Sequence, residues 1–439
     1  MKVFLNRMRS LLGSEYETFL RYYETGEHFR GLRVNTLKCS PKKLRELLGL
    51  DLLPTPFCLN GFYIPQGVQS LGNSPLHHCG AFYIQEPSAT SAAEMLGVKE
   101  GDFVLDLCAA PGGKSTQIGA MLNGTGLLWS NEIVRSRANI LLSNIERMGI
   151  RNAVVSNAHP EQLCKQLVGR FDKVLVDAPC SGEGMFRKNS EAQTEWTVEH
   201  VRSCADRQLR ILNSAKTSLK GGGVMVYSTC TFSREENEGV ITRFLNENPD
   251  FTLEDAGVSF GRPAMKYARR IFPMDGGERH FAARLRKKGE CVASAPCVCR
   301  SNTDEQILAF YDRLFPGRPF GENITVSRNK IIILPKNYQQ GGAVPVLRAG
   351  VILGEIVKNR IEPHHSAFVA AAKESCAQAV DFAVDSAEIH EYLHGEEIAV
   401  PDDIKGYTAV CVNGMTTGFG KASGGRLKNK YPKGLRTLK

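Results

Sequence analysis

The 439-residue sequence lacks the features that identify several large classes of protein. It has no run of about 18 apolar residues, so no membrane-spanning helix is expected. The opening residues, Met1 to Arg7, contain no long apolar stretch, so no signal peptide is expected. We find no internal repeat and no long low-complexity tract. With 42% hydrophobic residues, the composition is that of an ordinary globular protein of about two to four domains.

The cysteines lack the arrangement of a structural framework. There are 13, an odd number, and they are scattered along the chain. A cluster of three, Cys291, Cys297 and Cys299, has a spacing that matches no zinc-binding pattern. We therefore expect free thiols in a reducing, cytoplasmic setting and no metal site.

Positive charge is in excess, with a formal net charge of +9, and it is concentrated in two places. One is the segment from Arg284 to Lys288. The other is the C-terminal stretch from Lys421 to Lys439, where glycines and Tyr431 are interleaved with basic residues. Such a run is either a solvated surface or a binding site for a polyanion such as nucleic acid. Composition alone favours the two equally.

Strand and helix patterns alternate from Phe103 to about residue 285, which is typical of a doubly wound α/β sheet. The pattern predicts strands at residues 103–108, 126–131, 153–156, 171–177 and 224–227, then an antiparallel strand at 280–285. It predicts helices at 114–122, 135–148 and 198–219, the last ended by glycines 221–223. Two helix starts are also expected: Ser88 capping residues 89–96, and Ser233 with Glu236 forming a capping box.

Shorter units flank this central domain. The predicted division is an N-terminal α+β domain at 1–88, the central domain at 89–288, a linker at 289–304, a small α+β domain at 305–370 and a β-rich module at 371–439. The last of these carries the basic tail.

The segment from Asp106 to Ser115 joins the first predicted strand to its helix, and two interpretations compete for it. Its end, Gly113-Lys114-Ser115, is that of a phosphate-binding P-loop, which would make the protein a nucleotide hydrolase. A P-loop requires glycine where Cys108 stands, and Pro111 removes an N–H group that a phosphate would need. These two residues disfavour the P-loop.

The second interpretation is a nucleoside cofactor bound at successive strand ends. Gly112 and Gly113 allow the backbone to approach a ligand closely. Glu132 can bind both hydroxyls of a ribose, and Asn157 can reach the edge of an adenine. Lys114 and the helix start can hold a carboxylate. Ribose, adenine and carboxylate together describe S-adenosylmethionine better than a dinucleotide.

Two thiols follow neighbouring strands. The stretch from Asp177 to Gly182 suggests by itself that Cys180 is a nucleophile and Asp177 its orienting partner. Cys230 ends the next strand, so both thiols should lie at the edge where the cofactor binds. A thiolate beside a methyl donor suits methylation of a pyrimidine at C5: the thiolate adds to C6 and thereby activates C5. Asp177 can then hydrogen-bond the ring edge, and a base must remove the C5 proton.

These motifs resemble the signatures of the Sun-type (NSun) RNA cytosine-5 methyltransferases. The resemblance covers residues 30 to 288 and includes the motifs Leu32–Thr36, Tyr83–Glu86, Asp106–Lys114, Asp177–Lys188 and Ser228–Thr231. The C-terminal motifs Gly418–Lys421 and Leu427–Arg436 are similar to the end of RsmF-type bacterial enzymes. Those enzymes carry a PUA-like RNA-binding module and modify a cytosine of 16S rRNA.

The resemblance implies a Rossmann-like class I methyltransferase domain and assigns the roles of the thiols differently. It makes Cys230 the nucleophile and Cys180 the residue that assists product release, with Lys114 and Asp177 placed against the cofactor and the target base. It implies a cofactor site formed by Cys108, Ala109, Ala110, Pro111, Gly112, Gly113, Lys114, Glu132, Asn157 and Asp177.

The implied partner is RNA, most specifically 16S rRNA or the small ribosomal subunit. Arg187 and Lys188 are candidate contacts to the RNA backbone. Arg33 and Asn35 are expected to help shape the crevice. Nothing in the sequence demands a dimer, so a monomer is expected. A non-catalytic RNA-binding factor on a methyltransferase fold is the remaining alternative.

Overall fold

The computed structural model describes residues 1–24, 28–186, 193–194, 196–290, 304–339, 343–358 and 360–437. The candidate RNA contacts Arg187 and Lys188 lie outside these ranges, as do most of the predicted linker and its three clustered cysteines. Within them, no group of side chains could hold a metal ion. None of the helices described is long and apolar enough to cross a membrane.

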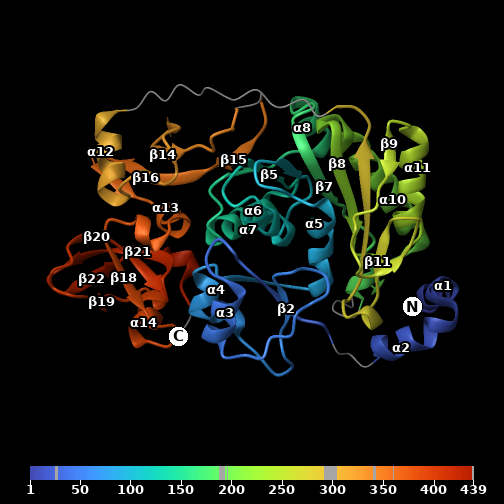
Figure 1. Cartoon of the computed structure of the whole chain (residues 1–439), viewed down its shortest axis with the longest axis horizontal. Helices are drawn as coiled ribbons and strands as arrows, with labels where there is room; N and C mark the ends of the chain where they lie inside the picture. The colour runs from blue at the N-terminus through green and yellow to red at the C-terminus, as the bar shows by residue number, and fades with distance from the viewer. Residues whose placement is uncertain are drawn as a thin grey trace.

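A ten-stranded mixed sheet forms the centre of the molecule (Figure 1). Its strand order is β10-β11-β12-β8-β7-β4-β5-β6-β15, and β9 pairs with β12. The five parallel strands are β4 (Phe103–Asp106), β5 (Leu127–Asn131), β6 (Ala153–Ser156), β7 (Phe171–Asp177) and β8 (Leu219–Thr229). The antiparallel strands at one side are β9 (Phe251–Leu253), β10 (Arg262–Pro263), β11 (Arg269–Ile271) and β12 (His280–Lys287).

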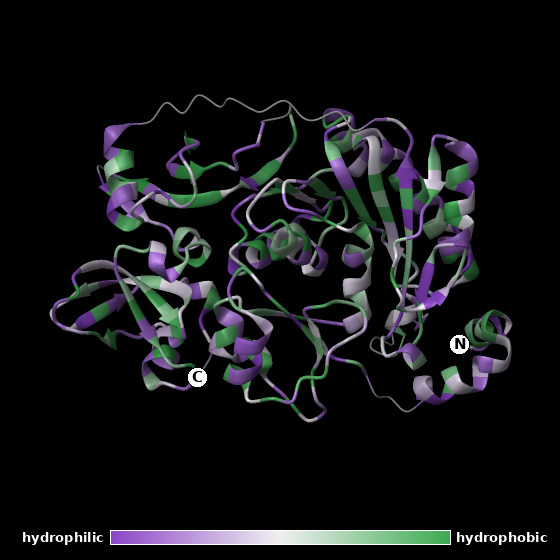
Figure 2. Ribbon diagram, viewed as in Figure 1, coloured by the Kyte–Doolittle hydropathy of each residue, from purple (hydrophilic) through white to green (hydrophobic). Residues whose placement is uncertain are grey.

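Helices cover both faces of this sheet, because successive residues of each strand point to opposite sides. On one face, Val104 and the side chains of neighbouring strands that point to the same side pack against helices α5 (Ser91–Leu96), α6 (Gly113–Met121) and α7 (Arg135–Arg147). On the other face, Leu105 and the side chains of neighbouring strands that point to that side pack against α8 (Pro160–Gln166), α10 (Val198–Ser218) and α11 (Val240–Glu247). Figure 2 shows hydrophobic residues along the central strands. The predicted doubly wound fold is confirmed.

The strand order places a ligand crevice at the centre of the sheet. The chain runs from β4 outward through β5 to β6, then returns to the other side of β4 and continues through β7 to β8. In open α/β sheets, ligands bind at the carboxyl ends of the strands where the order reverses. Here that position lies between Asp106, at the end of β4, and Asp177, at the end of β7.

Some predicted boundaries are wrong for local reasons. Glycines 221–223 lie inside β8, which starts directly after α10, so they do not form a turn. Ser88 does not cap the following helix. Instead, Glu86 caps the short 3-10 helix Pro87–Thr90 that leads into α5, since its carboxylate accepts hydrogen bonds from the N–H groups of Ser88 and Ala89 at 2.9 and 3.0 Å. Helix α8 was not predicted.

The segment after residue 304 contributes to the central sheet as well as forming its own. Strand β15 (Val346–Ala349) pairs antiparallel with β6 and so covers the edge of the central sheet. Directly after it, β16 (Val351–Val357) belongs to a four-stranded sheet with β13 (Ile324–Ser327), β14 (Lys330–Ile333) and β17 (Arg360–Pro363). Gly350 makes this change of sheet at φ 69°, and a Cβ there would lie 2.1 Å from the carbonyl oxygen of Ile333. Helices α12 (Glu305–Leu314) and α13 (His365–Ala370) pack on that sheet.

The two ends of the chain share one hydrophobic core. The N-terminal unit has helices α1 (Lys2–Leu12), α2 (Tyr16–Glu24), α3 (Pro41–Leu48) and α4 (Pro75–His78) and a sheet of β1 (Gly31–Val34), β2 (Gly61–Tyr63) and β3 (Phe82–Gln85). The last unit has β18 (Ala379–Phe382), β19 (Ile398–Ala399), β20 (Gly406–Val412), β21 (Met415–Ser423), β22 (Arg426–Asn429) and helix α14 (Ala387–His394). Leu32 and Leu76 of the first pack in one cluster with Tyr392 and Leu427 of the last.

Candidate active site

The two thiols that follow β7 and β8 lie in contact. The Sγ atoms of Cys180 and Cys230 are 3.3 Å apart. The two strands are parallel neighbours, with Asp177 opposite Ser228, so the loops that follow them leave the sheet side by side. Both thiols are partly exposed.

The interaction between the thiols makes them chemically different. A hydrogen bond from the Cys180 thiol stabilises the Cys230 thiolate, and the nearby charge of Arg279 adds to this, so the pKa of Cys230 lies below its usual value despite burial. The same hydrogen bond, together with burial, raises the pKa of Cys180 well above the ordinary value for a thiol. Because the thiolate is the nucleophilic form of cysteine, Cys230 is the more reactive of the two at neutral pH.

The difference in pKa between the two thiols predicts how alkylation of Cys230 depends on pH. A lowered pKa keeps the thiolate present as the pH falls below 9, so reaction with iodoacetamide should remain fast at pH 7.5. In a Cys180→Ala variant the donor is missing, and the midpoint of the pH–rate curve should move upward. The measurement is the rate of Cys230 modification by peptide mass spectrometry between pH 5.5 and 10. An unchanged midpoint in the variant would show that Cys180 does not stabilise the thiolate.

An ion pair lies beside the thiols. Lys114 Nζ donates to Asp177 Oδ2 at 2.8 Å, and Ser228 Oγ donates to Asp177 Oδ1 at 2.8 Å. Burial alone would favour the neutral carboxyl, but Lys114 holds the pKa of Asp177 below its usual value. The buried His280 stands next to this pair, and burial together with the charge of Lys114 lowers its pKa to about 3. The site therefore presents a charged carboxylate and a neutral imidazole.

A buried carboxylate fixes the loop that carries Cys180. Glu236 accepts a hydrogen bond from the Ser181 N–H at 2.9 Å and another from the Ser181 hydroxyl. Gln208 bridges Glu236 and the Pro179 carbonyl, at 2.8 and 3.0 Å. The predicted capping box of Ser233 and Glu236 is therefore wrong, because the Glu236 side chain turns inward to the neighbouring loop.

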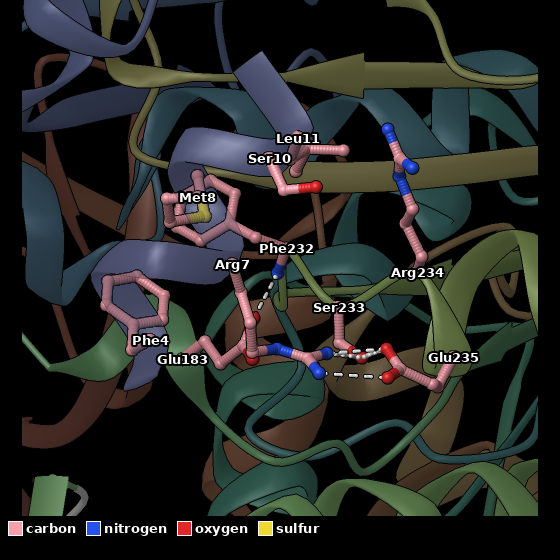
Figure 3. Close-up of a pocket in the computed structure, with 10 residues that line it drawn as sticks. All are labelled: Phe4, Arg7, Met8, Ser10, Leu11, Glu183, Phe232, Ser233, Arg234 and Glu235. Atoms are coloured by element: carbon pink, nitrogen blue, oxygen red, sulfur yellow. Dashed lines mark hydrogen bonds and ion pairs between the residues drawn. The ribbon is translucent and has the colours of Figure 1, made fainter. Parts of the chain in front are cut away.

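A second buried carboxylate fixes the loop that carries Cys230. Glu183 accepts from the Thr231 hydroxyl at 2.9 Å and from the Phe232 N–H at 3.0 Å, the latter drawn in Figure 3. Burial raises the pKa of Glu183 to about 7. Each thiol loop thus holds the other, since Glu183 follows Cys180 along the chain and Glu236 follows Cys230.

Helix α1 covers the outer side of these loops. Figure 3 shows Arg7 of α1 reaching Glu235, with a hydrogen bond of 2.9 Å from its Nη1 atom, while Phe4 and Phe232 line the same pocket. Arg7 lowers the pKa of Glu235 to about 2. The N-terminal helix is thereby attached to the segment directly after Cys230.

A cavity of about 220 Å³ lies on the other side of Asp177. Its lining includes seven of the predicted cofactor residues: Cys108, Ala109, Ala110, Pro111, Gly113, Lys114 and Asp177. It also includes Asp106, which is fully buried and whose pKa burial raises to about 7. Asp106 was not among the predicted cofactor residues, although its place at a strand end is the same signal that identified Glu132.

The N-terminal unit closes this cavity with Tyr83, Ile84 and Gln85 of β3. These residues were noted in the sequence as a family motif without a role. Arg33, which was expected to help shape the crevice, lies behind them and donates to the Thr116 hydroxyl at 2.7 Å. Asn35 bridges the Gly80 and Met148 carbonyls at 2.8 and 2.9 Å, so it joins the N-terminal unit to the central domain.

The remaining predicted cofactor residues, Gly112, Glu132 and Asn157, lie beyond the lining of this cavity. Gly112 has φ 115°, a conformation that favours glycine. Glu132 is buried at the end of β5 and accepts from the Val134 N–H at 3.0 Å. The Asn157 side-chain NH₂ donates to the carbonyls of Glu132 and Ile133 at 2.7 and 2.9 Å, so a contact from Asn157 to a base would have to use its Oδ1 atom.

The doubly wound sheet, with its crevice and the polar strand ends around it, defines a Rossmann-like methyltransferase. Four family descriptions match the chain in order: N-terminal domain of 16S rRNA methyltransferase RsmF (residues 2–87), 16S rRNA methyltransferase RsmB/F (93–286), RsmF rRNA methyltransferase first C-terminal domain (309–370) and methyltransferase RsmF PUA domain (379–437).

Similar proteins agree along the whole chain. Ribosomal RNA small subunit methyltransferase F of Vibrio vulnificus YJ016 is 34% identical, covering 99% of this chain and 97% of the relative. The enzyme of the same name from Vibrio cholerae M66-2 is 33% identical over 92% of this chain and 91% of the relative. The chain therefore belongs to the RsmF family of ribosomal RNA small subunit methyltransferases, and the predicted family is confirmed.

Solved structures agree with the fold. A methyltransferase homolog protein from Pyrococcus horikoshii is 30% identical, covers 65% of this chain and 95% of its own, and superposes with a TM-score of 0.59. NSun6 from Pyrococcus horikoshii with SFG is 25% identical, covers 65% and 98%, and has the same TM-score of 0.59. Membership of a methyltransferase family sets aside the nucleotide-hydrolase alternative.

Proposed function

We propose that this protein transfers a methyl group from S-adenosylmethionine to C5 of a cytosine in RNA, specifically in 16S rRNA, in the cytoplasm. The observation that carries the proposal is the contact of 3.3 Å between the Sγ atoms of Cys180 and Cys230, which lets one thiol donate a hydrogen bond to the thiolate of the other. Methylation of an exocyclic amine or a ribose hydroxyl needs no thiolate, because those atoms are themselves nucleophilic. A pyrimidine C5 is not, and it requires covalent activation at C6.

The cavity beside Asp177 fits S-adenosylmethionine. A Cβ on Gly113 would lie 2.8 Å from Gln85 Oε1, so a larger residue there would displace the Gln85 side chain that forms part of this wall. One oxygen of the buried Asp106, Oδ1, has no hydrogen-bond partner among the described residues and is available to a ligand. SFG, present in the NSun6 structure, is an analogue of this cofactor. We assign its site to Asp106, Cys108–Lys114, Glu132 and Asn157, and the cofactor would supply an electrophilic methyl group on a sulfonium.

The protein's own residues would carry the remaining chemistry. The Cys230 thiolate adds to C6 of the cytosine, and the electron pair this places on C5 forms the bond to the methyl group. Asp177, kept ionised by Lys114, accepts a hydrogen bond from the amino group of the ring and so orients it. A base then takes the C5 proton, the electron pair of that C–H bond restores the C5–C6 double bond, and the C–S bond breaks so that its electron pair returns to Cys230 as the thiolate.

Cys180 fits a role in that last step. Its sulfur lies 3.3 Å from that of Cys230, so its thiol can donate to the departing thiolate as the C–S bond breaks. The hypothesis drawn from the stretch Asp177–Gly182 alone, which made Cys180 the nucleophile, would require Cys180 to be the thiolate and Cys230 the hydrogen-bond donor. A high pKa suits a donor and a low pKa suits a nucleophile.

The function is tested by mapping 5-methylcytosine in ribosomal RNA. Bisulfite sequencing of 16S rRNA from a deletion strain should reveal at least one cytosine that is converted in the deletion strain and protected in the parent. A plasmid copy of the gene should restore protection, while a copy with Cys230→Ala should not. Incubating the purified protein with labelled S-adenosylmethionine and either deproteinised 16S rRNA or small subunits then identifies the substrate. Identical bisulfite patterns in all strains would refute the proposal.

A further inference from the structure

A second cavity, of about 420 Å³, lies where three parts of the chain meet. Helix α4 of the N-terminal unit contributes His77 and His78, and α7 of the central domain contributes Ser143. His365 of α13 and the C-terminal segment containing Arg436 complete the walls. Its volume is within the range of about 300–1,000 Å³ that is usual for small-molecule sites. None of the residues assigned to the methyl-transfer site lines it.

The walls hold polar atoms that the protein leaves without partners. His365 Nδ1 and Arg436 Nε are both buried, and neither has a hydrogen-bond partner within the described part of the chain. His365 as a whole is only 7% exposed. Burying such atoms without a partner costs free energy, so their presence in a cavity wall points to a ligand that forms the missing hydrogen bonds.

The histidines of the cavity are uncharged. Burial lowers the pKa of His77 to about 3 and that of His365 to about 4. Burial also lowers the pKa of His78, whose Nδ1 atom lies 2.9 Å from the Tyr431 hydroxyl. A neutral imidazole offers one donor and one acceptor, as the edge of a nucleobase does, and presents a flat ring for stacking.

Positive charge comes from arginine instead. Arg147 and Arg436 both line the cavity. The acid nearby, Glu146, is already paired with Arg348 of β15, which keeps its pKa low in spite of burial. The cavity therefore combines aromatic rings, neutral hydrogen-bonding groups and uncompensated cationic charge.

We propose that this junction cavity binds one unpaired nucleotide of the RNA substrate, its base among the rings of His77, His365 and Tyr431 and its phosphate at Arg436. Sequence-specific RNA recognition commonly takes an unstacked base onto aromatic side chains, and arginine binds the phosphate. The inference rests on the proposed function, since RNA is the substrate that would carry this nucleotide.

The cavity is connected to the cofactor site through one aromatic residue. The guanidinium of Arg147 lies 5.7 Å from the ring centroid of Tyr83, which itself lines the cofactor cavity. Arg147 also donates to the carbonyls of His77 and Phe82 at 2.8 and 3.2 Å. Arg147 thus joins the wall of this cavity to Tyr83 of the cofactor cavity.

Binding of nucleoside 5′-monophosphates to the full-length protein tests the proposal without any methyl transfer. S-adenosylhomocysteine at saturating concentration fills the cofactor site, and binding is measured by titration calorimetry or saturation-transfer NMR. Ser143→Tyr should weaken nucleotide binding at least tenfold by filling the cavity from an exposed position. Arg436→Gln should weaken it similarly and should remove the advantage of nucleotides over nucleosides.

Arg426→Gln is the matched control, because it removes the same charge from an exposed position of the same unit. It should leave nucleotide affinity unchanged, and all three variants should keep the unfolding temperature of the parent. Equal nucleotide affinity in Ser143→Tyr and the parent would overturn the proposal, as would equal binding of inorganic phosphate alone. Failure of the proposed function would instead appear as unmodified rRNA in the bisulfite experiment, with nucleotide binding intact.

Discussion

Replacing Cys230 by alanine should reduce methyl transfer to 16S rRNA at least about a thousandfold, the scale seen when a covalent nucleophile is removed. The residual site would still hold cofactor and RNA, but C5 of cytosine would lack the electron pair that addition at C6 supplies. Neither Lys114, which is paired with Asp177, nor the neighbouring Cys180, whose pKa is raised, can replace it. The measurement is incorporation of labelled methyl groups under single-turnover conditions.

Two controls separate lost chemistry from lost folding. Cys376→Ala removes another partly exposed thiol, in the C-terminal part of the chain, and should retain full activity. Cys230→Ala should bind S-adenosylhomocysteine with the affinity of the parent, because Cys230 does not line the cofactor cavity. Substantial activity in Cys230→Ala would show that another group is the nucleophile, and Cys180 would be the first to test.

The strand ends were predictable because they depend on local pattern. A buried strand followed by a polar residue identified Asp177 and Glu132. Cys180 and Cys230 lie at the same edge because each follows within three residues the carboxyl end of one of two parallel neighbouring strands. The helix and strand boundaries of the central domain also follow from short-range periodicity and agree with the structure to within a few residues for most elements.

The hydrogen bonds that hold the two thiol loops in place could not be predicted in this way. Glu236 satisfies a capping-box pattern three residues after Ser233, yet its carboxylate bonds to Ser181, 55 residues away. Local and distant partners compete for the same side chain, and the buried, otherwise unsatisfied Ser181 N–H decides the outcome. The link from Arg7 to Glu235 spans 228 residues and carries no sequence signature.

The relative placement of the domains could not be predicted from the sequence either. Strand β15 satisfies an edge of the central sheet, although the periodicity around it is that of an independent unit. An open edge strand attracts another strand because its N–H and C=O groups are unpaired. The shared core of Leu32, Leu76, Tyr392 and Leu427 likewise brings the two ends of the chain together, which is why the junction cavity exists and why its residues have no common motif.

Replacing Cys180 by alanine should have a different result from replacing Cys230: a covalent complex between protein and RNA should accumulate. Without the thiol proton of Cys180, addition of Cys230 to C6 and methylation of C5 still occur, but the departing thiolate loses its hydrogen-bond donor. Release therefore slows more than formation. The complex is visible as a band of reduced mobility on a denaturing gel that disappears after ribonuclease treatment.

The pH dependence of this trapping gives the sharper test, because loss of the donor also raises the pKa of Cys230. Formation of the complex by Cys180→Ala should consequently increase with pH, by about tenfold per unit below the raised pKa, since only the thiolate adds. The double variant Cys180→Ala with Cys230→Ala should form no complex at any pH. A Cys180→Ala protein that neither traps RNA nor turns over would contradict the release role, and trapping in the double variant would show that the adduct involves another residue.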